Sequence, residues 1–469
     1  FFVTEKVHAD PDPLDLENLL PDFYSDPTIS TSAGYYGDAA EVIVDPFTGK
    51  LLVTATDVVI PGNGGMDIRL QRHYTSLDPL EMPEYSNIGT GWSMHYGQVR
   101  IMDPDRMCNR LWSVSMAGNP VYVGPDGRTR ALAFVTVPVS QQLGAEYASS
   151  ESDLVHCNQD GTFYMRSPTG HRYDFDEYSY DAESDYPAVW HVTKVTDRNG
   201  NYIEINYTAS GAYGGMEKVI SNITSNDGRS VSFNYQGLTT SSPRITSVVY
   251  GTDTWSYSYS NGDFGDGGRR RYLSQVQDPA GQSWNYTYWP YNSAGNSGAG
   301  SIQTVTNPHG GTYQVAYGLQ QFNTDSIDAR THIVVTSKAR YSGQNQVSSK
   351  AYSYHQSSSS AVSDTTTVQE DDGVRVFRHY GLSGATNENV WRIGVLDSVE
   401  FTPTNGTTRT ENFFWDAQNI SQENYKRNRG DGIYVPVDTS YRIPYMTGKQ
   451  VQQEGVTYET EYAGFFAHG

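Results

Sequence analysis

The chain has 469 residues, of which 37% are hydrophobic, 13% are aromatic and 36 are tyrosine, and its formal net charge is −21. This charge argues against nucleic acid and anionic membranes as partners, since both carry phosphate groups that repel an acidic surface. No run of apolar residues approaches the length that a membrane-spanning helix needs. The tyrosines, 45 glycines and 21 prolines instead favour a protein built of strands and tight turns.

The first part of the chain differs from the rest. Residues 1–38 are rich in Asp and Pro and are predicted to form an acidic arm, with one short helix at Leu14–Leu20 directly after Pro13. We expect this arm to dock on a neighbouring chain or to plug an opening. Strand signals begin near Ala39, with apolar runs at Val42–Val44 and Val58–Ile60. These signals predict a β region over residues 39–120 that closes one end of the molecule, followed by a repeat region over residues 121–469.

One spaced pattern recurs four times in the repeat region. Its copies are centred on Gly200, Gly228, Gly281 and Gly310. In each copy, aliphatic residues stand eight and five positions before the glycine, and a polar residue stands three positions before it. β-Forming residues stand three, five and seven positions after it, and the last of these is always a tyrosine: Tyr207, Tyr235, Tyr288 and Tyr317. Two short strands around a turn cannot bury an apolar face alone, so neighbouring copies are expected to stack into one sheet.

Further copies of the pattern are imperfect. Around Gly251, the residues Trp255, Tyr257 and Tyr259 come one position late, which we attribute to a bulge or a lengthened loop. Partial copies surround Gly406 and Gly455. Asn-Gly and Asp-Gly pairs recur along the chain and are typical of two-residue hairpin turns.

These motifs resemble those of the Rhs/YD-repeat family. Asp197–Asn201 and Val276–Gly281 match the repeat unit, and four upstream motifs resemble the segment that precedes the repeats: Asp45–Gly49, Asp57–Gly62, Leu70–Ser76 and Gly89–Trp92. The resemblance covers residues 39–320 well and 320–469 loosely. It implies an all-β fold in which a strip of repeats winds into a shell or barrel-like wall, similar to the Tc-toxin cocoon and the teneurin barrel. Because no late Asp-Pro-x-Gly-Leu motif occurs, we expect the front portion of such a shell, incomplete at its C-terminus.

Candidate catalytic and metal-binding groups are sparse. Gly295–Gly298 lacks the strand-to-helix elbow of a serine hydrolase, and no H-E-x-x-H occurs. Two acidic clusters, Asp263 with Asp266 and Asp103 with Asp105, place oxygen ligands close together without completing a calcium loop. We therefore predict no enzyme activity, no catalytic, cofactor-binding or metal site, and no cofactor, with calcium the nearest candidate.

The two cysteines, Cys108 and Cys157, leave two alternatives open. They form one disulfide if the protein is exported, or they are two buried thiols. Because the chain opens with Phe1 and shows no signal peptide, we interpret it as processed or truncated. We expect an extracellular or cell-surface location.

The sequence thus predicts a non-enzymatic, secreted or surface structural protein that forms part of a β shell or an extracellular assembly. Its expected partners are further copies of itself or a downstream shell or cargo segment, without membrane insertion. The alternative is an adhesin or carbohydrate-binding module that presents its tyrosine rows to glycans. Packing of the same tyrosines across adjacent strands is the competing explanation of the rows.

Overall fold

The computed structural model describes residues 42–76, 86–101, 107–108, 120–125, 127, 129–135, 144–149, 151, 153–180, 188–211, 217–240, 243–261, 271–290, 298–323, 329–357, 363–381, 390–419, 425–428, 434–437 and 442–462. In these residues the protein is all-β, apart from two short 3-10 turns at Asn63–Gly65 and Val390–Arg392. The predicted fold class is therefore confirmed. The predicted arm, including the helix at Leu14–Leu20, lies outside the described residues.

The first sheet has four antiparallel strands in chain order, and we call it the inner sheet. They are β1 (Val42–Val44), β2 (Leu51–Ile60), β3 (Ile68–Thr75) and β4 (Trp92–Ser93). Buried residues alternate with less buried ones along the first half of β2, as expected for a strand with one face in the core. The pairing of β2 with β3 slips between Thr56 and Val58, so Asp57 is the extra residue of a β-bulge.

The second sheet, which we call the wall, holds most of the chain. Its strands are β5 (Gln98–Ile101), β6 (Val121–Val123), β7 (Thr129–Phe134), β8 (Tyr147–Ser149), β9 (Leu154–Cys157), β10 (Phe163–Arg166), β11 (Arg172–Ser179), β12 (Ala188–Thr196), β13 (Tyr202–Ala209), β14 (Lys218–Ser225), β15 (Ser230–Gln236), β16 (Arg244–Tyr250), β17 (Asp253–Asn261), β18 (Arg271–Gln277), β19 (Ser283–Tyr288), β20 (Ile302–Thr306), β21 (Gly311–Asn323), β22 (Ala329–Ser342), β23 (Asn345–His355), β24 (Asp364–Glu370), β25 (Gly373–His379), β26 (Leu396–Pro403), β27 (Arg409–Asn419), β30 (Arg442–Gln453) and β31 (Val456–Glu461). A separate hairpin consists of β28 (Tyr425–Asn428) and β29 (Tyr434–Val437).

The wall has a closed part and an open part. Residues 188–191 of β12 pair with β5, whereas residues 194–196 pair with β13. Strands β5–β12 therefore close into a ring, and β13–β31 continue from β12 as an open antiparallel strip. The wall as a whole is thus not a closed barrel.

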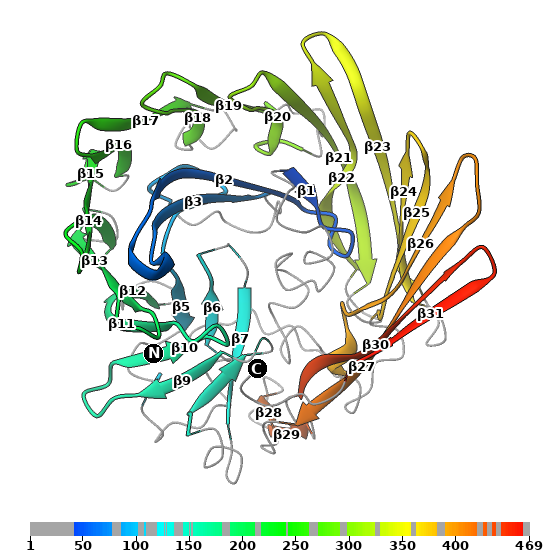
Figure 1. The fold of residues 1–469 in the computed structure, drawn as a ribbon, viewed down its shortest axis with the longest axis horizontal. Helices are drawn as coiled ribbons and strands as arrows, with labels where there is room; N and C mark the ends of the chain where they lie inside the picture. Colours follow the sequence, from blue (N-terminus) through cyan, green and yellow to red (C-terminus); the bar gives the residue numbers. More distant parts are fainter. Residues whose placement is uncertain are drawn as a thin grey trace.

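The strip curves around the inner sheet. In Figure 1, β13–β20 form an arc, and β2 and β3 lie in its hollow. Buried apolar residues of both sheets belong to one continuous hydrophobic cluster, which extends from Val42 to Phe413. The core of the molecule is therefore the space between the inner sheet and the concave face of the wall.

Candidate functional site

The four predicted repeats are four hairpins of the strip, on strand pairs β12–β13, β14–β15, β18–β19 and β20–β21. In the first hairpin, the N–H of Asp197 donates to the carbonyl of Asn201, and the N–H of Gly200 donates back to Asp197. The anchor glycines of the four copies have φ between +82° and +88°, a left-handed conformation that favours glycine. The loop thus has three residues and ends on the glycine, so the prediction of two-residue turns was wrong for these copies.

The polar residue of each copy holds its turn together. The Asp197 carboxylate accepts the N–H groups of Asn199 and Asn201, at 2.7 Å and 2.9 Å. Asn307 accepts two N–H groups at the same offsets in the last copy. A side-chain acceptor that satisfies turn N–H groups is the reason for a polar residue at this position.

The copy around Gly251 differs through its turn. Tyr250 pairs directly with Asp253, so the loop is the two-residue segment Gly251–Thr252. The glycine is here the first loop residue rather than the last, which shifts the residues after it by one position. The predicted cause, a bulge or a lengthened loop, was therefore wrong.

A β-bulge accompanies each repeat tyrosine. The two aliphatic residues of a copy, such as Ile220 and Ile223, are both buried although they are three positions apart. In a strand of period two, such residues face opposite sides unless an extra residue stands between them. The structure shows this extra residue at Ser221, where the pairing of β13 with β14 slips. An odd spacing of core residues was thus the sequence signal for the bulge.

The tyrosine hydroxyl bonds the main chain beside the bulge. Tyr235 donates to the carbonyl of Ile220, the residue directly before Ser221, at 2.7 Å. The same bond recurs from Tyr207 to Val192, Tyr259 to Ile245, Tyr288 to Leu273 and Tyr317 to Ile302, at 2.7–2.9 Å. A bulge disrupts the ladder locally, so an additional donor stabilises the carbonyl there. Each copy of the repeat therefore supplies one bulge and one tyrosine whose hydroxyl stabilises a carbonyl beside a bulge.

The tyrosine rows are consequently not exposed. The four rings of Tyr207, Tyr235, Tyr288 and Tyr317 are half-buried and pack against the hydrophobic cluster. Burial raises the pKa of all four hydroxyls above the usual value. The structure thus supports the packing explanation over the alternative of exposed tyrosine rows, because the hydroxyls bond the main chain and the rings pack against the core.

The most polar part of the core is an ion pair between β2 and β3. The bulge residue Asp57 accepts a hydrogen bond from Arg72 Nε at 2.6 Å, and both side chains are at most 1% exposed. Two wall tyrosines complete the cluster: Tyr257 donates to Asp57 at 2.8 Å, and Arg72 Nη1 donates to Tyr286 at 2.9 Å. The guanidinium carbon also lies 5.1 Å from the centre of the Trp92 ring. We call these five residues the Arg72 cluster.

Electrostatics keep the Arg72 cluster charged. Burial alone would lower the pKa of Arg72, but Asp57, together with Tyr286 and Tyr257, more than offsets this and raises the pKa above the usual value. Burial raises the pKa of Tyr257, and the Asp57 charge adds to this effect. The paired carboxylate and guanidinium, through their hydrogen bonds to Tyr257 and Tyr286, can anchor the inner sheet to two separate wall strands, β17 and β19. Since these side chains are shielded from solvent, we assign the cluster a structural role.

Main-chain contacts fasten the rest of the inner sheet and the segment before β4 to the wall. Val335 N donates to Gly49 O, Thr90 N donates to Arg271 O, and Ile245 N donates to Asn87 O, at 2.8–2.9 Å. Arg229 on the turn before β15 donates to the carbonyls of Ile60 and Met66. The motifs upstream of the repeats thus contain the residues that touch the wall.

Close approach explains two glycines of these motifs. A Cβ on Gly89, whose φ is +110°, would lie 2.9 Å from the main-chain nitrogen of Leu273. A Cβ on Gly49, whose φ is +74°, would lie 2.7 Å from the Val334 side chain. At both positions only glycine fits the backbone and the space.

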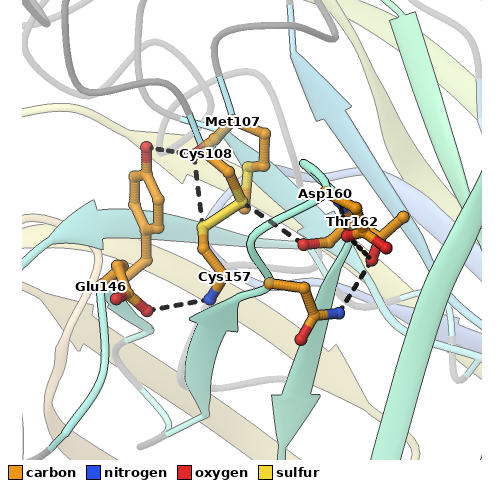
Figure 2. Close-up of a disulfide and its surroundings, with 8 residues drawn as sticks. Met107, Cys108, Glu146, Cys157, Asp160 and Thr162 are labelled. Carbon is orange, nitrogen blue, oxygen red and sulfur yellow. Dashed lines mark hydrogen bonds between the residues drawn. A yellow bond between two sulfur atoms is a disulfide. The ribbon is translucent and has the colours of Figure 1, made fainter.

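Cys108 and Cys157 form a disulfide with a Cα–Cα distance of 5.6 Å (Figure 2). The bond ties residues 107–108 to β9 in the ring. Figure 2 also shows that Cys157 N donates to Glu146. The Tyr147 hydroxyl donates to the carbonyl of Met107. Of the two alternatives that the sequence left open, the structure shows the disulfide.

The structure does not place the acidic and serine candidates from the sequence. Asp103, Asp105, Asp263, Asp266 and Gly295–Ser297 lie outside the described residues. Among the residues that the structure describes, no group of three or more His, Cys, Asp or Glu side chains is arranged to hold a metal ion. In the same residues, no helix is long and apolar enough to cross a membrane.

One family model matches the first part of the chain. Residues 42–130 match the model described as "Domain of unknown function (DUF6531)". The match covers the inner sheet and the first strands of the ring. It confirms the resemblance to the Rhs/YD-repeat family that the motifs indicate. No curated protein sequence matches the chain.

The solved structures that match this chain include a bacterial effector domain and a Tc holotoxin pore. The N-terminal domain of effector protein SpvB from Salmonella typhimurium strain LT2 is 11% identical over 61% of this chain and 99% of its own, with a TM-score of 0.24. The crystal structure of TcdB2-TccC3-TEV is 12% identical over 85% of this chain, with a TM-score of 0.30. A Photorhabdus luminescens Tc holotoxin pore is 10% identical over 89% of this chain, with a TM-score of 0.29. The chain spans only 22% and 23% of these two toxin chains. At these scores we base no argument on the superpositions.

Proposed function

We propose that this protein is a non-enzymatic wall segment of an exported β shell. The observation that carries the proposal is the recurring bond from a repeat tyrosine to the carbonyl beside a bulge. Bulges increase the local bend and twist of a strand. One bulge per hairpin, at the same place in successive copies, curves the strip in one direction around the inner sheet.

The arrangement suits enclosure better than catalysis or ligand binding. The concave face of the strip from β15 to β25 contacts the inner sheet through its side chains and main chain. Thr366 on β24 donates to the carbonyl of Pro46, and Phe47 packs on His379 of β25 with ring centres 5.3 Å apart. The polar residues that lie deepest, Arg72 and Asp57, bond to each other and to wall tyrosines. Arg72 and Asp57 fix the position of the wall, and because they are buried a substrate cannot reach them.

Export is supported by the disulfide. Disulfides persist in oxidising compartments and are rare in the cytosol of most cells. We therefore propose an extracellular or cell-surface location, with a downstream shell segment, its cargo or a further copy of the chain as partner. Thiol alkylation and mass spectrometry of protein isolated from its own host test the location. Two alkylated cysteines without prior reduction would contradict it.

Electron microscopy of the protein isolated from its own host, with every segment it naturally carries, tests enclosure. We expect a hollow particle whose interior protein is resistant to added protease until the particle is denatured. A solid or flat particle without protected material would contradict the shell. A glycan array is the second readout: binding that is lost on Tyr→Ala changes at Tyr207 or Tyr235, in variants that remain folded, would favour the adhesin alternative instead.

A further inference from the structure

The junction between ring and strip contains two buried histidines. His191 lies on β12 directly opposite Gln98 of β5, within the pairing that closes the ring. His95 lies three residues before Gln98, and between them Gly97 O accepts the N–H of Val192 at 3.2 Å. His95 is 9% exposed and His191 is 5% exposed. Both rings thus lie in one seam, which we define as residues 95–101 with residues 188–192 and call the β5–β12 seam.

The hydrogen bonds of His95 require a neutral ring. Its Nδ1 lies 3.1 Å from the main-chain nitrogen of Gly97, whose N–H can only donate. Nδ1 must therefore be an unprotonated acceptor. Its Nε2 is buried and has no hydrogen-bond partner among the described residues. Protonation would place a second donor against the Gly97 N–H and a charge in a dry environment.

The environment of His191 also favours a neutral ring. Its Nε2 lies 2.8 Å from Ser179 Oγ, and the same hydroxyl accepts the N–H of Lys218 at 2.8 Å. With an unprotonated Nε2, the hydroxyl can donate its own hydrogen to the ring while it accepts the Lys218 N–H. The ring also packs on Tyr207, with centres 5.0 Å apart, beside the repeat bond from Tyr207 to Val192. Protonation of Nε2 would remove the acceptor that this hydroxyl uses.

The neighbouring charges are mostly positive. The groups that face the two rings are Arg100 on β5, Lys218 on β14, His73 on β3, Glu177 on β11, Tyr96 before β5 and Tyr207 on β13. The carboxylate of Glu177 is 3.1 Å from Lys218 Nζ, so its charge is already paired. Burial, followed by Lys218 and Arg100, lowers the pKa of His191 to about 3. Burial, followed by Arg100, His73 and His191, lowers the pKa of His95 well below the usual value.

We propose that the β5–β12 seam is an acid-sensitive closure, which neutral His95 and His191 hold shut and which opens when both rings take up protons. This proposal goes beyond the proposed function of the wall as a fixed enclosure. It identifies the pairing at which the ring opens and the change, protonation, that opens it. Opening would separate β5 from β12 and leave the pairs β11–β12 and β12–β13 in place.

The direction of the pH effect follows from the two states. An exposed imidazole has a pKa of about 6.5, whereas both rings have lower values in the closed seam. Closure is therefore complete above about pH 6.5 and weakens as the pH falls toward 3. At pH 5, His191 alone raises the opening constant by a factor of about 30, and His95, whose pKa is also lowered, adds to this rise.

Hydrogen exchange of the intact protein measures this opening. Peptides that cover Gln98–Ile101 and Ala188–Val192 are compared at pH 8 and pH 5, after correction for the intrinsic exchange rate. The β16–β17 hairpin, which contains no histidine, is the internal control. We expect the opening constant of the seam to rise at least about 30-fold, and that of the control less than about 3-fold. A rise in the seam that is no larger than in the control overturns the proposal.

Two conservative substitutions separate the histidines from general acid effects. His95→Asn keeps an acceptor near Nδ1, and His191→Gln keeps one near Nε2, but neither side chain titrates. At pH 8 the double variant should exchange hydrogen like the wild-type protein. At pH 5 the opening constant of its seam should rise no more than that of the control hairpin. Replacing the exposed His309 by Gln should leave the wild-type response intact. A double variant whose opening constant still rises fully between pH 8 and pH 5 overturns the proposal. If the double variant fails to fold, the single variant His191→Gln replaces it, and we expect its rise in the opening constant to be about 30-fold smaller than that of the wild-type protein.

Discussion

The strip and the inner sheet are held in place by different kinds of interaction. The four repeat hairpins share one bond, from a tyrosine hydroxyl to the carbonyl beside a bulge. The inner sheet depends instead on contacts that occur once, above all the pair of Arg72 and Asp57. Repetition distributes stability over many equivalent sites, whereas single contacts concentrate it. The two regions should therefore respond very differently to point substitutions.

Loss of Arg72 should have the largest effect. In Arg72→Met, Asp57 remains as a buried carboxylate without its partner, and we expect the free energy of unfolding to fall by about 3–5 kcal/mol. Urea denaturation followed by tryptophan fluorescence measures this loss. The double variant Arg72→Met with Asp57→Leu should recover most of it, because neither charge remains. A loss below about 1 kcal/mol in the single variant would show that the Arg72 cluster does not anchor the inner sheet.

A glycine at the contact between the two regions should matter more than a glycine within a repeat. Gly228 has φ of +88° and open space around its Cβ position, so Gly228→Ala introduces backbone strain alone, of about 1 kcal/mol. Gly89→Ala adds a clash with the main chain of Leu273, and we expect at least about twice that loss. Thermal unfolding of both variants makes the comparison. Equal losses would mean that the wall can shift away from Gly89 without cost.

The sequence predicted the strip far better than the inner sheet. The spacing around Gly200 and Gly310 was enough to predict paired strands, because the same spacing of aliphatic, polar and β-forming residues recurs in every copy. The three-residue loop was missed because Asn-Gly and Asp-Gly pairs are compatible with two turn types. The turn's own polar residue, Asp197, was the signal that separates them.

The Arg72 cluster could not be predicted from the sequence. Arg72 is 214 residues from Tyr286, and Asp57 is 200 residues from Tyr257. No local pattern connects residues at such separations, since only the curvature of the strip brings β17 and β19 to the inner sheet. The sequence could not decide between a disulfide and two thiols for the same reason, because a spacing of 49 residues is compatible with pairing but does not require it.

Loss of a single repeat bond should have a moderate and uniform effect. Tyr235→Phe keeps the packed ring and removes the donor for Ile220 O, which should cost about 1 kcal/mol. Tyr207→Phe and Tyr317→Phe remove the same bond and should cost about the same amount. Tyr288→Phe also removes the acceptor of the Trp92 indole N–H and should cost up to about twice as much. The exposed Tyr178 is the control, and Tyr178→Phe should cost less than about 0.5 kcal/mol. A spread of several kcal/mol among the four repeat variants would contradict the equivalence of the hairpins.

The smallest effect should come from an ion pair on the strip surface. Lys194 and Glu204 lie 3.1 Å apart, but their side chains are 34% and 45% exposed. Water and salt screen such a pair, and Lys194→Met should therefore change stability by no more than about 0.5 kcal/mol, with less effect at 1 M salt. Arg72→Met should lose the same stability at both salt concentrations, since the Arg72 cluster is shielded from ions. If both variants responded equally to salt, water would reach the Arg72 cluster, and the contact between inner sheet and wall would be looser than the hydrogen bonds indicate.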